Sequence, residues 1–351
     1  RTEVSDGGHR MIVNASQLFS FLKRIQSERL GGFDEVILPE RTEKGNLFFT
    51  RMNGETKIEI DSFRTVDPLK SLFYFPREQV FPDIKKPVKR MILGVKNCDL
   101  TALAVLDKAM INSDFIDPVY QSWRENTTIV SADCTEISDS CHCNLVDGKP
   151  FADKGFDVNL SNIGNDYVIT TGSSKGEEFI ELLRRHIPTS DDHAEDREKV
   201  RELRQKTMRR LEARNSDFVR SGDYFILKNT DIQKWKDESK SCVGCGGCTN
   251  ICPTCYCLIL NDETTSRDFV KVRSYDSCQI HGYARVAGGA SPRPKMYERF
   301  RNRYLCKLMI MKENFGRLGC TGCGRCIDVC PGKIEFREVV RRMMESPKAE
   351  E

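Results

Sequence analysis

Cysteine is the residue type in this sequence whose spacing most clearly indicates chemistry. The chain has 16 cysteines in 351 residues, and eight of them fall in two strings of identical spacing. The strings are Cys242-x-x-Cys245-x-x-Cys248-x-x-x-Cys252-Pro253 and Cys320-x-x-Cys323-x-x-Cys326-x-x-x-Cys330-Pro331. In such strings the first three thiolates bind one [4Fe–4S] cluster and the fourth binds the neighbouring cluster. The sequence therefore predicts one cluster at Cys242, Cys245, Cys248 and Cys330, and another at Cys320, Cys323, Cys326 and Cys252.

Zinc sites and disulfide bonds are the two alternatives for a chain with this many cysteines. Four-cysteine zinc sites also use C-x2-C pairs, but a longer loop usually separates the pairs. Sixteen cysteines in 351 residues lie well below the roughly 8–10% typical of a disulfide scaffold. The sequence shows no signal peptide, so we expect a cytoplasmic protein with reduced thiols.

A third group of four cysteines lies upstream of the strings. Cys98 and Cys134 each follow a predicted strand, and Cys141-x-Cys143 lies in the next polar loop. Loops at the carboxyl ends of strands in an α/β sheet commonly hold ligands. Spacing alone thus favours a third [4Fe–4S] cluster at Cys98, Cys134, Cys141 and Cys143, with buried free thiols as the alternative.

The remaining cysteines are Cys255, Cys257, Cys278 and Cys306. They again form a C-x-C pair with two separate partners, so they either hold a fourth cluster or pack as structural thiols against the other clusters. His142 and His281 lie beside cysteines. Each is interpreted as a surface or hydrogen-bonded residue, with metal ligation as the alternative.

The elements that must position these cysteines follow an α/β pattern in the first half of the chain. A strand at Lys89–Val95 followed by a helix at Asp99–Met110 indicates a strand–turn–helix unit. Apolar spacing predicts further helices at residues 16–28 and 176–186. Further strands are expected at Glu35–Leu38, Leu47–Arg51, Lys57–Ile60, Leu72–Phe75, Thr127–Ser131 and Tyr167–Thr171.

The second half changes composition twice. Residues from Pro188 to about Asp196 are acidic and polar, and residues 197–220 are highly charged, which is typical of a solvated helix. We therefore expect an α+β region at 1–90, an α/β region with a cysteine site at 91–187, a charged helical linker at 188–240 and a mainly helical dicluster ferredoxin domain at 241–345.

Several function classes are disfavoured by the rest of the sequence. The net charge is only +3, which does not indicate a nucleic-acid surface. No segment approaches the roughly 20 apolar residues of a membrane span. The chain has no G-x-G-x-x-G after a strand, so no flavin or nicotinamide site is assigned, and TGSSKG at 171–176 is interpreted as a turn before a helix. With no acid–base constellation either, we assign no catalytic residue.

Longer segments around the cysteines resemble a known family. SCVGCGGCTNICPTCYC, YDSCQIHGYARVAGGASPRP, RFRNRYLCK and GCTGCGRCIDVCP closely resemble the beta subunit of archaeal cytosolic sulfhydrogenases, which are NADP-linked [NiFe] hydrogenases. The resemblance extends upstream to GVKNCDLTALAVLD and CTEISDSCHCNLVDGKPFADKGFDVNL. The iron–sulfur A subunit of anaerobic sulfite reductase is similar in layout, but RNRYLCK favours the hydrogenase family.

The resemblance implies an electron-transfer subunit of a multisubunit oxidoreductase. Such a subunit would relay electrons between a [NiFe] catalytic module and a flavin- and NAD(P)-binding subunit, without catalysis of its own. The resemblance also supports the third cluster and leaves the fourth open, so at least two clusters are expected. The alternatives are the corresponding iron–sulfur subunit of an anaerobic sulfite reductase, a polyferredoxin module of another dehydrogenase, and a zinc-binding interaction module.

Overall fold

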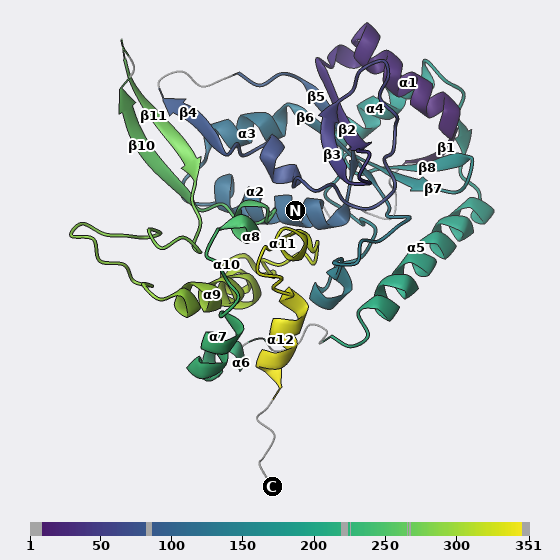
Figure 1. Ribbon diagram of the computed structural model, residues 1–351. Coiled ribbons are helices and arrows are strands. Elements are labelled where there is room, and N and C mark those ends of the chain that lie inside the picture. The colour runs from purple at the N-terminus through teal and green to yellow at the C-terminus, as the bar shows by residue number, and fades with distance from the viewer. Residues whose placement is uncertain are drawn as a thin grey trace.

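An eight-stranded mixed sheet forms the centre of the first half of the chain (Figure 1). The computed structural model describes residues 9–81, 86–218, 224, 226–264, 266 and 268–345. The strand order is β3-β2-β5-β6-β7-β8-β1-β9, and β2, β5, β6 and β7 run parallel. The strands are β1 (Arg10–Asn14), β2 (Glu35–Arg41), β3 (Leu47–Arg51), β5 (Arg90–Val95), β6 (Thr127–Ala132), β7 (Val158–Asn162), β8 (Asp166–Thr171) and β9 (Ser190–Asp191).

The inner strands of this sheet are buried on both faces. Every residue of β5 and of β6 is buried, as expected for parallel strands covered by helices on both sides. Helices α1 (Ala15–Glu28) and α4 (Ser174–Arg184) pack into one apolar core. Helices α2 (Asn97–Met110) and α3 (Pro118–Glu125) pack into the core on the opposite face. The sheet is therefore the middle layer of a three-layer α/β unit.

The cysteine-rich half combines short helices with a small second sheet. Strands β10 (Leu258–Thr264) and β11 (Phe269–Tyr275) form a hairpin, and β4 (Arg77–Phe81) pairs with β11. The helices are α6 (Ile226–Asn229), α7 (Ile232–Glu238), α8 (Gly247–Asn250), α9 (Met296–Leu305), α10 (Met311–Phe315), α11 (Arg325–Asp328) and α12 (Phe336–Met344), with a π-helical turn at Cys306–Ile310 between α9 and α10. Trp235, Phe300, Tyr304 and Phe336 centre the third core.

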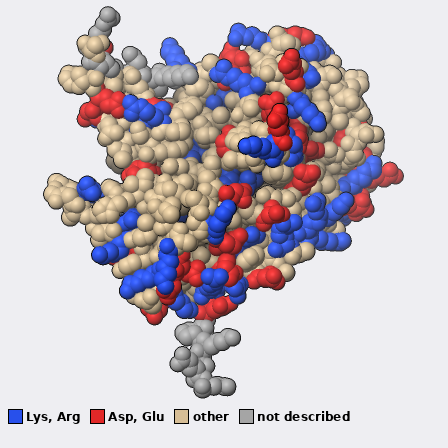
Figure 2. Space-filling model, in the orientation of Figure 1, with Lys and Arg blue, Asp and Glu red and all other residues tan. Residues whose placement is uncertain are grey.

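Helix α5 (Ala194–Arg214) connects the two halves. Figure 2 shows Lys and Arg side chains gathered along this helix with acidic side chains among them. Only Asp196, Thr207 and Leu211 of α5 are buried. The solvated charged helix expected at 197–220 is therefore confirmed as far as Arg214, while residues 219–220 lie outside the described residues.

Most expected elements of the first half are confirmed, with shifts of a few residues at their ends. Two expected strands are wrong. Residues 57–60 are irregular, and Ile60 uses its carbonyl to accept a bond from Lys96 Nζ rather than in a ladder. Leu69–Leu72 is a 3₁₀ turn that places Phe73 and Tyr74 together in the core, so alternation fails there.

The cysteine-rich part is not confirmed as mainly helical, because β10 and β11 form a hairpin within it. Little in the sequence indicates this hairpin. In residues 258–264 (LILNDET) three apolar residues are followed by four polar ones, so the sequence lacks the alternation of a half-buried strand. The structure leaves almost all of these residues exposed. Strands β1, β4, β7 and β9 are likewise not among the elements that the sequence predicts.

Arg273 ties the small sheet to the α/β unit. Its guanidinium, 4% exposed, forms ion pairs with Glu78 on β4 and with Asp117 at the start of α3. It also lies 4.6 Å from the centre of the Tyr74 ring. Three segments that are far apart in sequence therefore share one buried cation.

We expect Arg273→Met to destabilise the protein by about 3–5 kcal/mol, because two largely buried carboxylates would lose their cation. The matched control is Arg77→Met on the neighbouring strand, whose ion pair with Glu263 is exposed and should matter little. Anaerobic thermal unfolding of the purified variants measures both effects. Equal destabilisation by the two substitutions would contradict the role given to Arg273.

Candidate iron–sulfur sites

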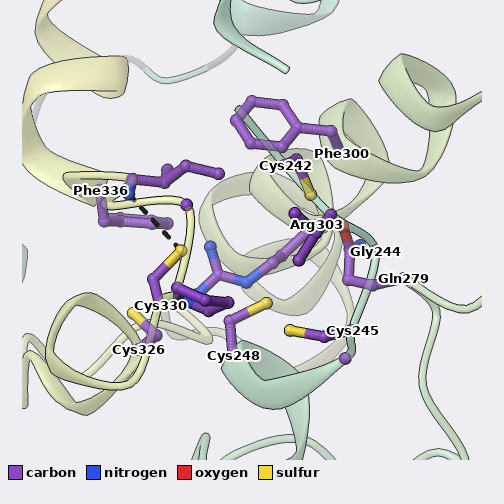
Figure 3. Close-up of a pocket in the computed structure, with 15 residues that line it drawn as sticks. Cys242, Gly244, Cys245, Cys248, Gln279, Phe300, Arg303, Cys326, Cys330 and Phe336 are labelled. Carbon is purple, nitrogen blue, oxygen red and sulfur yellow. Dashed lines mark hydrogen bonds between the residues drawn. The ribbon is translucent and has the colours of Figure 1, made fainter. Parts of the chain in front are cut away.

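The first string and the last cysteine of the second string line one cavity (Figure 3). Its lining includes Cys242, Cys245, Cys248 and Cys330, together with Cys326. The backbone N–H of Ile334 points at Cys330 Sγ at 3.5 Å, which is the kind of donor that tunes a cluster sulfur. The structure thus brings together the four cysteines predicted for one cluster. That they bind iron stays a prediction.

The remaining cysteines of the strings gather behind this cavity. Burial raises the pKa of Cys326 to about 12, and the neighbouring Cys323 and Cys252 add to the effect, while Arg303 opposes it. Burial likewise raises the pKa of Cys320, and electrostatic repulsion from Cys326, Cys323 and Cys252 raises it further. The predicted set of Cys320, Cys323, Cys326 and Cys252 is therefore a neighbourhood in space. Metal binding would deprotonate such thiols despite their raised pKa values.

The third group surrounds a cavity at the carboxyl ends of the sheet strands. Cys98 lies in the first turn of α2 after β5, and Cys134 follows β6. Both line this cavity with Cys141 and Cys143, and Cys323 of the second string borders it as well. The four cysteines of the α/β unit are thus brought together, next to a cysteine of the dicluster strings.

The backbone contact at this junction is close. His142 N–H donates to the carbonyl of Gly322 at 2.8 Å. Gly322 has φ +66°, and a Cβ there would lie 2.3 Å from Cys143 Cα. Only glycine fits both the left-handed backbone and this approach.

A buried ion pair fixes the same junction. Arg325 on α11 donates to both carboxylate oxygens of Asp99 on α2, at 2.9 and 2.7 Å, and both side chains are 1% exposed. Arg325 also donates to the Thr65 carbonyl at 2.9 Å. Because Asp99 follows Cys98 and Arg325 precedes Cys326, the pair sets the position of one cysteine group relative to the other.

The fourth group lies at the base of the β10–β11 hairpin. Cys255 and Cys257 precede β10, Cys278 follows β11, and Cys306 begins the π-helical turn. Electrostatic interaction with Cys278 contributes to the raised pKa of both Cys306 and Cys257, so these three thiols are neighbours. The Cys255 N–H donates to the carbonyl of Cys252 in the first string at 3.3 Å. The fourth group therefore adjoins the dicluster strings.

No three His, Cys, Asp or Glu side chains in the described part of the chain surround a single metal-ion position. This finding is compatible with iron–sulfur clusters, since each cysteine of a [4Fe–4S] cube binds a different iron atom. The thiols of one cluster therefore do not need to converge on one point.

The two histidines beside cysteines differ in environment. His142 is buried, and burial lowers its pKa to about 4, so the ring is neutral at pH 7. Its Nδ1 lies 2.8 Å from the Ser140 carbonyl and must donate to it, which leaves Nε2 as an acceptor 3.7 Å from Cys320 Sγ. His281 is exposed in the loop after Cys278.

Buried polar atoms without partners border the strings. Arg303 Nε, Tyr304 Oη and Thr321 Oγ1 are among the described buried atoms that have no hydrogen-bond partner. Figure 3 shows the Arg303 guanidinium among the sulfurs of Cys248 and Cys330. Unpaired buried donors are costly, and an anionic cluster with sulfide acceptors at this place would satisfy a guanidinium. The residues present therefore fit the group that the spacing predicts.

Sequence reasoning missed the buried cations of these sites. Arg303, Lys307 and Lys96 are each at most 7% exposed and lie beside cysteines. The local signals are that Lys307 directly follows Cys306, that Arg303 lies three residues before Cys306, and that Lys96 lies two residues before Cys98. Nothing in the sequence separates these cations from the many on the surface.

Comparison with known proteins agrees with this geometry. Residues 241–334 match the family model described as a 4Fe-4S dicluster domain, so the chain contains a domain of this class. It is 33% identical to sulfhydrogenase 2 subunit beta of Pyrococcus furiosus over 306 aligned residues. The aligned region covers 85% of this chain and 89% of that protein. The chain belongs to this family of sulfhydrogenase beta subunits.

A more distant relative shares part of the chain. The F420-dependent formate dehydrogenase subunit beta of Methanocaldococcus jannaschii is 22% identical over 179 residues, or 49% of this chain and 40% of that protein. Both relatives are named as subunits of oxidoreductases.

The exchange of the fourth cysteine between strings can be tested by pairing substitutions. If Cys252 binds the cluster of Cys320, then Cys252→Ala combined with Cys320→Ala should lose no more iron than either single variant, about four atoms per chain. Cys252→Ala combined with Cys242→Ala should lose about eight. Iron and acid-labile sulfide analysis gives the count, and the reverse pattern would show that each string closes its own cluster.

We expect Cys143→Ala to remove about four iron atoms per chain and to leave the spectroscopic signals of the two string clusters intact. Ser138→Ala in the same loop is the control and should retain all iron. Unchanged iron in Cys143→Ala would show that the third group consists of ordinary thiols.

Proposed function

We propose that this chain is the electron-relay subunit of a heteromeric oxidoreductase. It would carry electrons between a [NiFe] hydrogenase module of the sulfhydrogenase type and a flavin- and NAD(P)-binding subunit. The observation that carries the proposal is the spatial continuity of the cysteine groups. Cys323 borders the third cavity, Cys326 borders the first, and Cys252 adjoins Cys255 of the fourth group.

The proposal assigns each group of four cysteines to one [4Fe–4S] cluster, so that the chain holds up to four. The ligand sets are Cys242, Cys245, Cys248 and Cys330; Cys320, Cys323, Cys326 and Cys252; Cys98, Cys134, Cys141 and Cys143; and Cys255, Cys257, Cys278 and Cys306. The clusters supply one-electron transfer when bound. The chain's own residues hold them in place, exclude water and present N–H groups and cations to the sulfurs.

Cluster 1, at the first string, is the one that comes nearest to solvent. Cys245 is the exposed cysteine of the chain, and Val243 beside it is 65% exposed. The other three groups contain no exposed cysteine. A partner subunit that covers Val243 would come close enough to exchange electrons with this cluster, and the interior groups would extend the route.

A second function is favoured by the formate dehydrogenase relative. The same relay would then serve another dehydrogenase as a polyferredoxin module, and the iron–sulfur subunit of an anaerobic sulfite reductase is a further alternative of the same kind. The protein that copurifies with the chain decides among them, because nickel, sirohaem or neither would be found by metal and pigment analysis.

Within the described residues, no helix has the length and apolar character needed to cross a membrane. The cytoplasmic location and the lack of nucleic-acid partners expected from the sequence remain predictions.

The purified, metal-analysed chain should accept electrons from dithionite but should catalyse neither hydrogen oxidation nor sulfite reduction, since it supplies a route and no substrate site. Activity should appear when the catalytic subunit is added back. Anaerobic bleaching of the iron–sulfur absorbance and a hydrogen-uptake assay measure the two parts. Turnover by the single chain would overturn the relay proposal.

A further inference from the structure

Two lysines are buried beside one short segment that joins the first string to the fourth group. Lys70 and Lys307 are each 2% exposed. Lys70 comes from the 3₁₀ turn Leu69–Leu72 of the α/β unit, whereas Lys307 lies in the π-helical turn after Cys306. The two ammonium groups therefore reach the same place from opposite halves of the chain.

Their contacts centre on residues 250–255. Lys70 Nζ donates to the carbonyls of Asn250 at 3.2 Å and Cys255 at 3.0 Å. Lys307 Nζ donates to Thr254 Oγ1 at 2.6 Å, and that hydroxyl lies 3.3 Å from Cys252 Sγ. All of these hydrogen-bond partners are uncharged.

Neither lysine has a carboxylate partner among the described residues. The salt bridges of that part of the chain include Arg325 and Arg273, which are equally buried, but not Lys70 or Lys307. Burying an ammonium ion costs several kcal/mol when no opposite charge is near, and two adjacent ammonium ions also repel each other. Lys70 has a partial substitute in the Tyr275 ring, 4.4 Å away. Lys307 lies within hydrogen-bonding reach of the Cys255 thiol and 3.9 Å from Met311 Sδ, in addition to its bond to Thr254.

Other buried cations without carboxylates are accounted for differently. Arg90 lies over the rings of Phe73 and Trp123 at 4.9 and 4.3 Å. Arg299 donates to the backbone carbonyls of residues 279, 293 and 294. The lysine pair differs because the groups around it that can become anions are cysteines, namely Cys252, Cys255, Cys257 and Cys306.

We infer that Lys70 and Lys307 are the buried counter-charge of two adjoining clusters, the one bound by Cys252 and a fourth one bound by Cys255, Cys257, Cys278 and Cys306. A [4Fe–4S] cube with four thiolates is a dianion when oxidised and gains a further negative charge on accepting an electron. Two fixed ammonium ions stabilise both states and favour the reduced state more. They are positioning residues that raise the reduction potentials of these two clusters. An electron passing between the partner subunits would therefore reside mainly on one of the two. The inference rests on the proposed function.

The test is Lys307→Met and Lys70→Met in the full chain, prepared anaerobically, because methionine keeps the length of the side chain and removes the charge. A potentiometric titration followed by electron paramagnetic resonance should show one or two clusters shifted to more negative potential. The expected size is about tenfold in the ratio of reduced to oxidised cluster at a fixed potential, which is about 59 mV for a one-electron couple.

Lys307→Arg and Lys312→Met are the controls. The arginine variant keeps the buried charge and should keep the potentials near those of the unmodified chain. Lys312 is exposed on the next helix, and its loss should shift nothing. If Lys307→Met instead loses about four iron atoms and Lys307→Arg retains them, the charge is needed to hold the cluster, which also supports the inference. Loss of iron in both variants would indicate a packing role and overturn it.

The counter-charge and the relay fail in different ways. If the unmodified chain holds sixteen iron atoms and neither methionine variant shifts a potential, the role of the two lysines as counter-charge is refuted. The relay proposal is unaffected by that result. About twelve or fewer iron atoms in the unmodified chain, with Cys257→Ala losing none, would remove the fourth cluster and with it this inference, while the relay would stand on the other groups. A chain that cannot be reduced at all would refute the relay itself.

Discussion

Buried charge is the constraint on which the arrangement of this protein depends. Cysteines that are to become thiolates lie in the interior, and interior anions need cations that are themselves protected from water. Arg303 meets this need beside the first string, and Lys96, bonded to the Ile60 carbonyl at 2.8 Å, does so beside the third group. Arg325 lies near Cys98 and Cys323 and is paired with the carboxylate of Asp99 as well. Buried cations from both halves of the chain therefore border the cysteine groups.

The same balance explains why the α/β unit and the cysteine-rich half are packed so closely. Arg64, from the first half, donates to the Cys323 carbonyl at 2.6 Å and to Ser140 Oγ at 3.0 Å. Tyr74 donates to the Tyr256 carbonyl at 3.2 Å and stacks on Tyr275. These contacts hold backbone segments near cysteines rather than merely covering apolar surface. Rigid placement of this kind suits a role in which distances between redox centres set the rate of transfer.

The parts of the structure that follow from local spacing are predictable from the sequence. The two strings, the buried strand before Cys98 and the helix after it are all visible there, because each rests on a short repeated pattern. The grouping of Cys98 with Cys134, Cys141 and Cys143 follows from the strand ends, and the structure places them around one cavity. The hairpin β10–β11 cannot be predicted in the same way, since β10 is almost wholly exposed and its apolar and polar residues do not alternate. The buried cations are invisible for another reason, which is that burial of a lysine depends on tertiary contacts with residues far away in the sequence.

The close approach of Gly322 to Cys143 bears on how the chain can be divided. A neighbouring glycine, Gly324, with φ +75°, makes a second such contact, since a Cβ there would lie 2.3 Å from the Ser140 carbonyl oxygen. The backbone of the second string thus packs closely against the loop of residues 140–143 in the α/β unit, although the family model spans only residues 241–334. A fragment cut at that boundary would carry both strings but would leave one wall of its cluster site, and the partner of Arg325, behind. The segment 241–334, which by sequence could be a separate domain, therefore depends on the α/β unit for part of its packing.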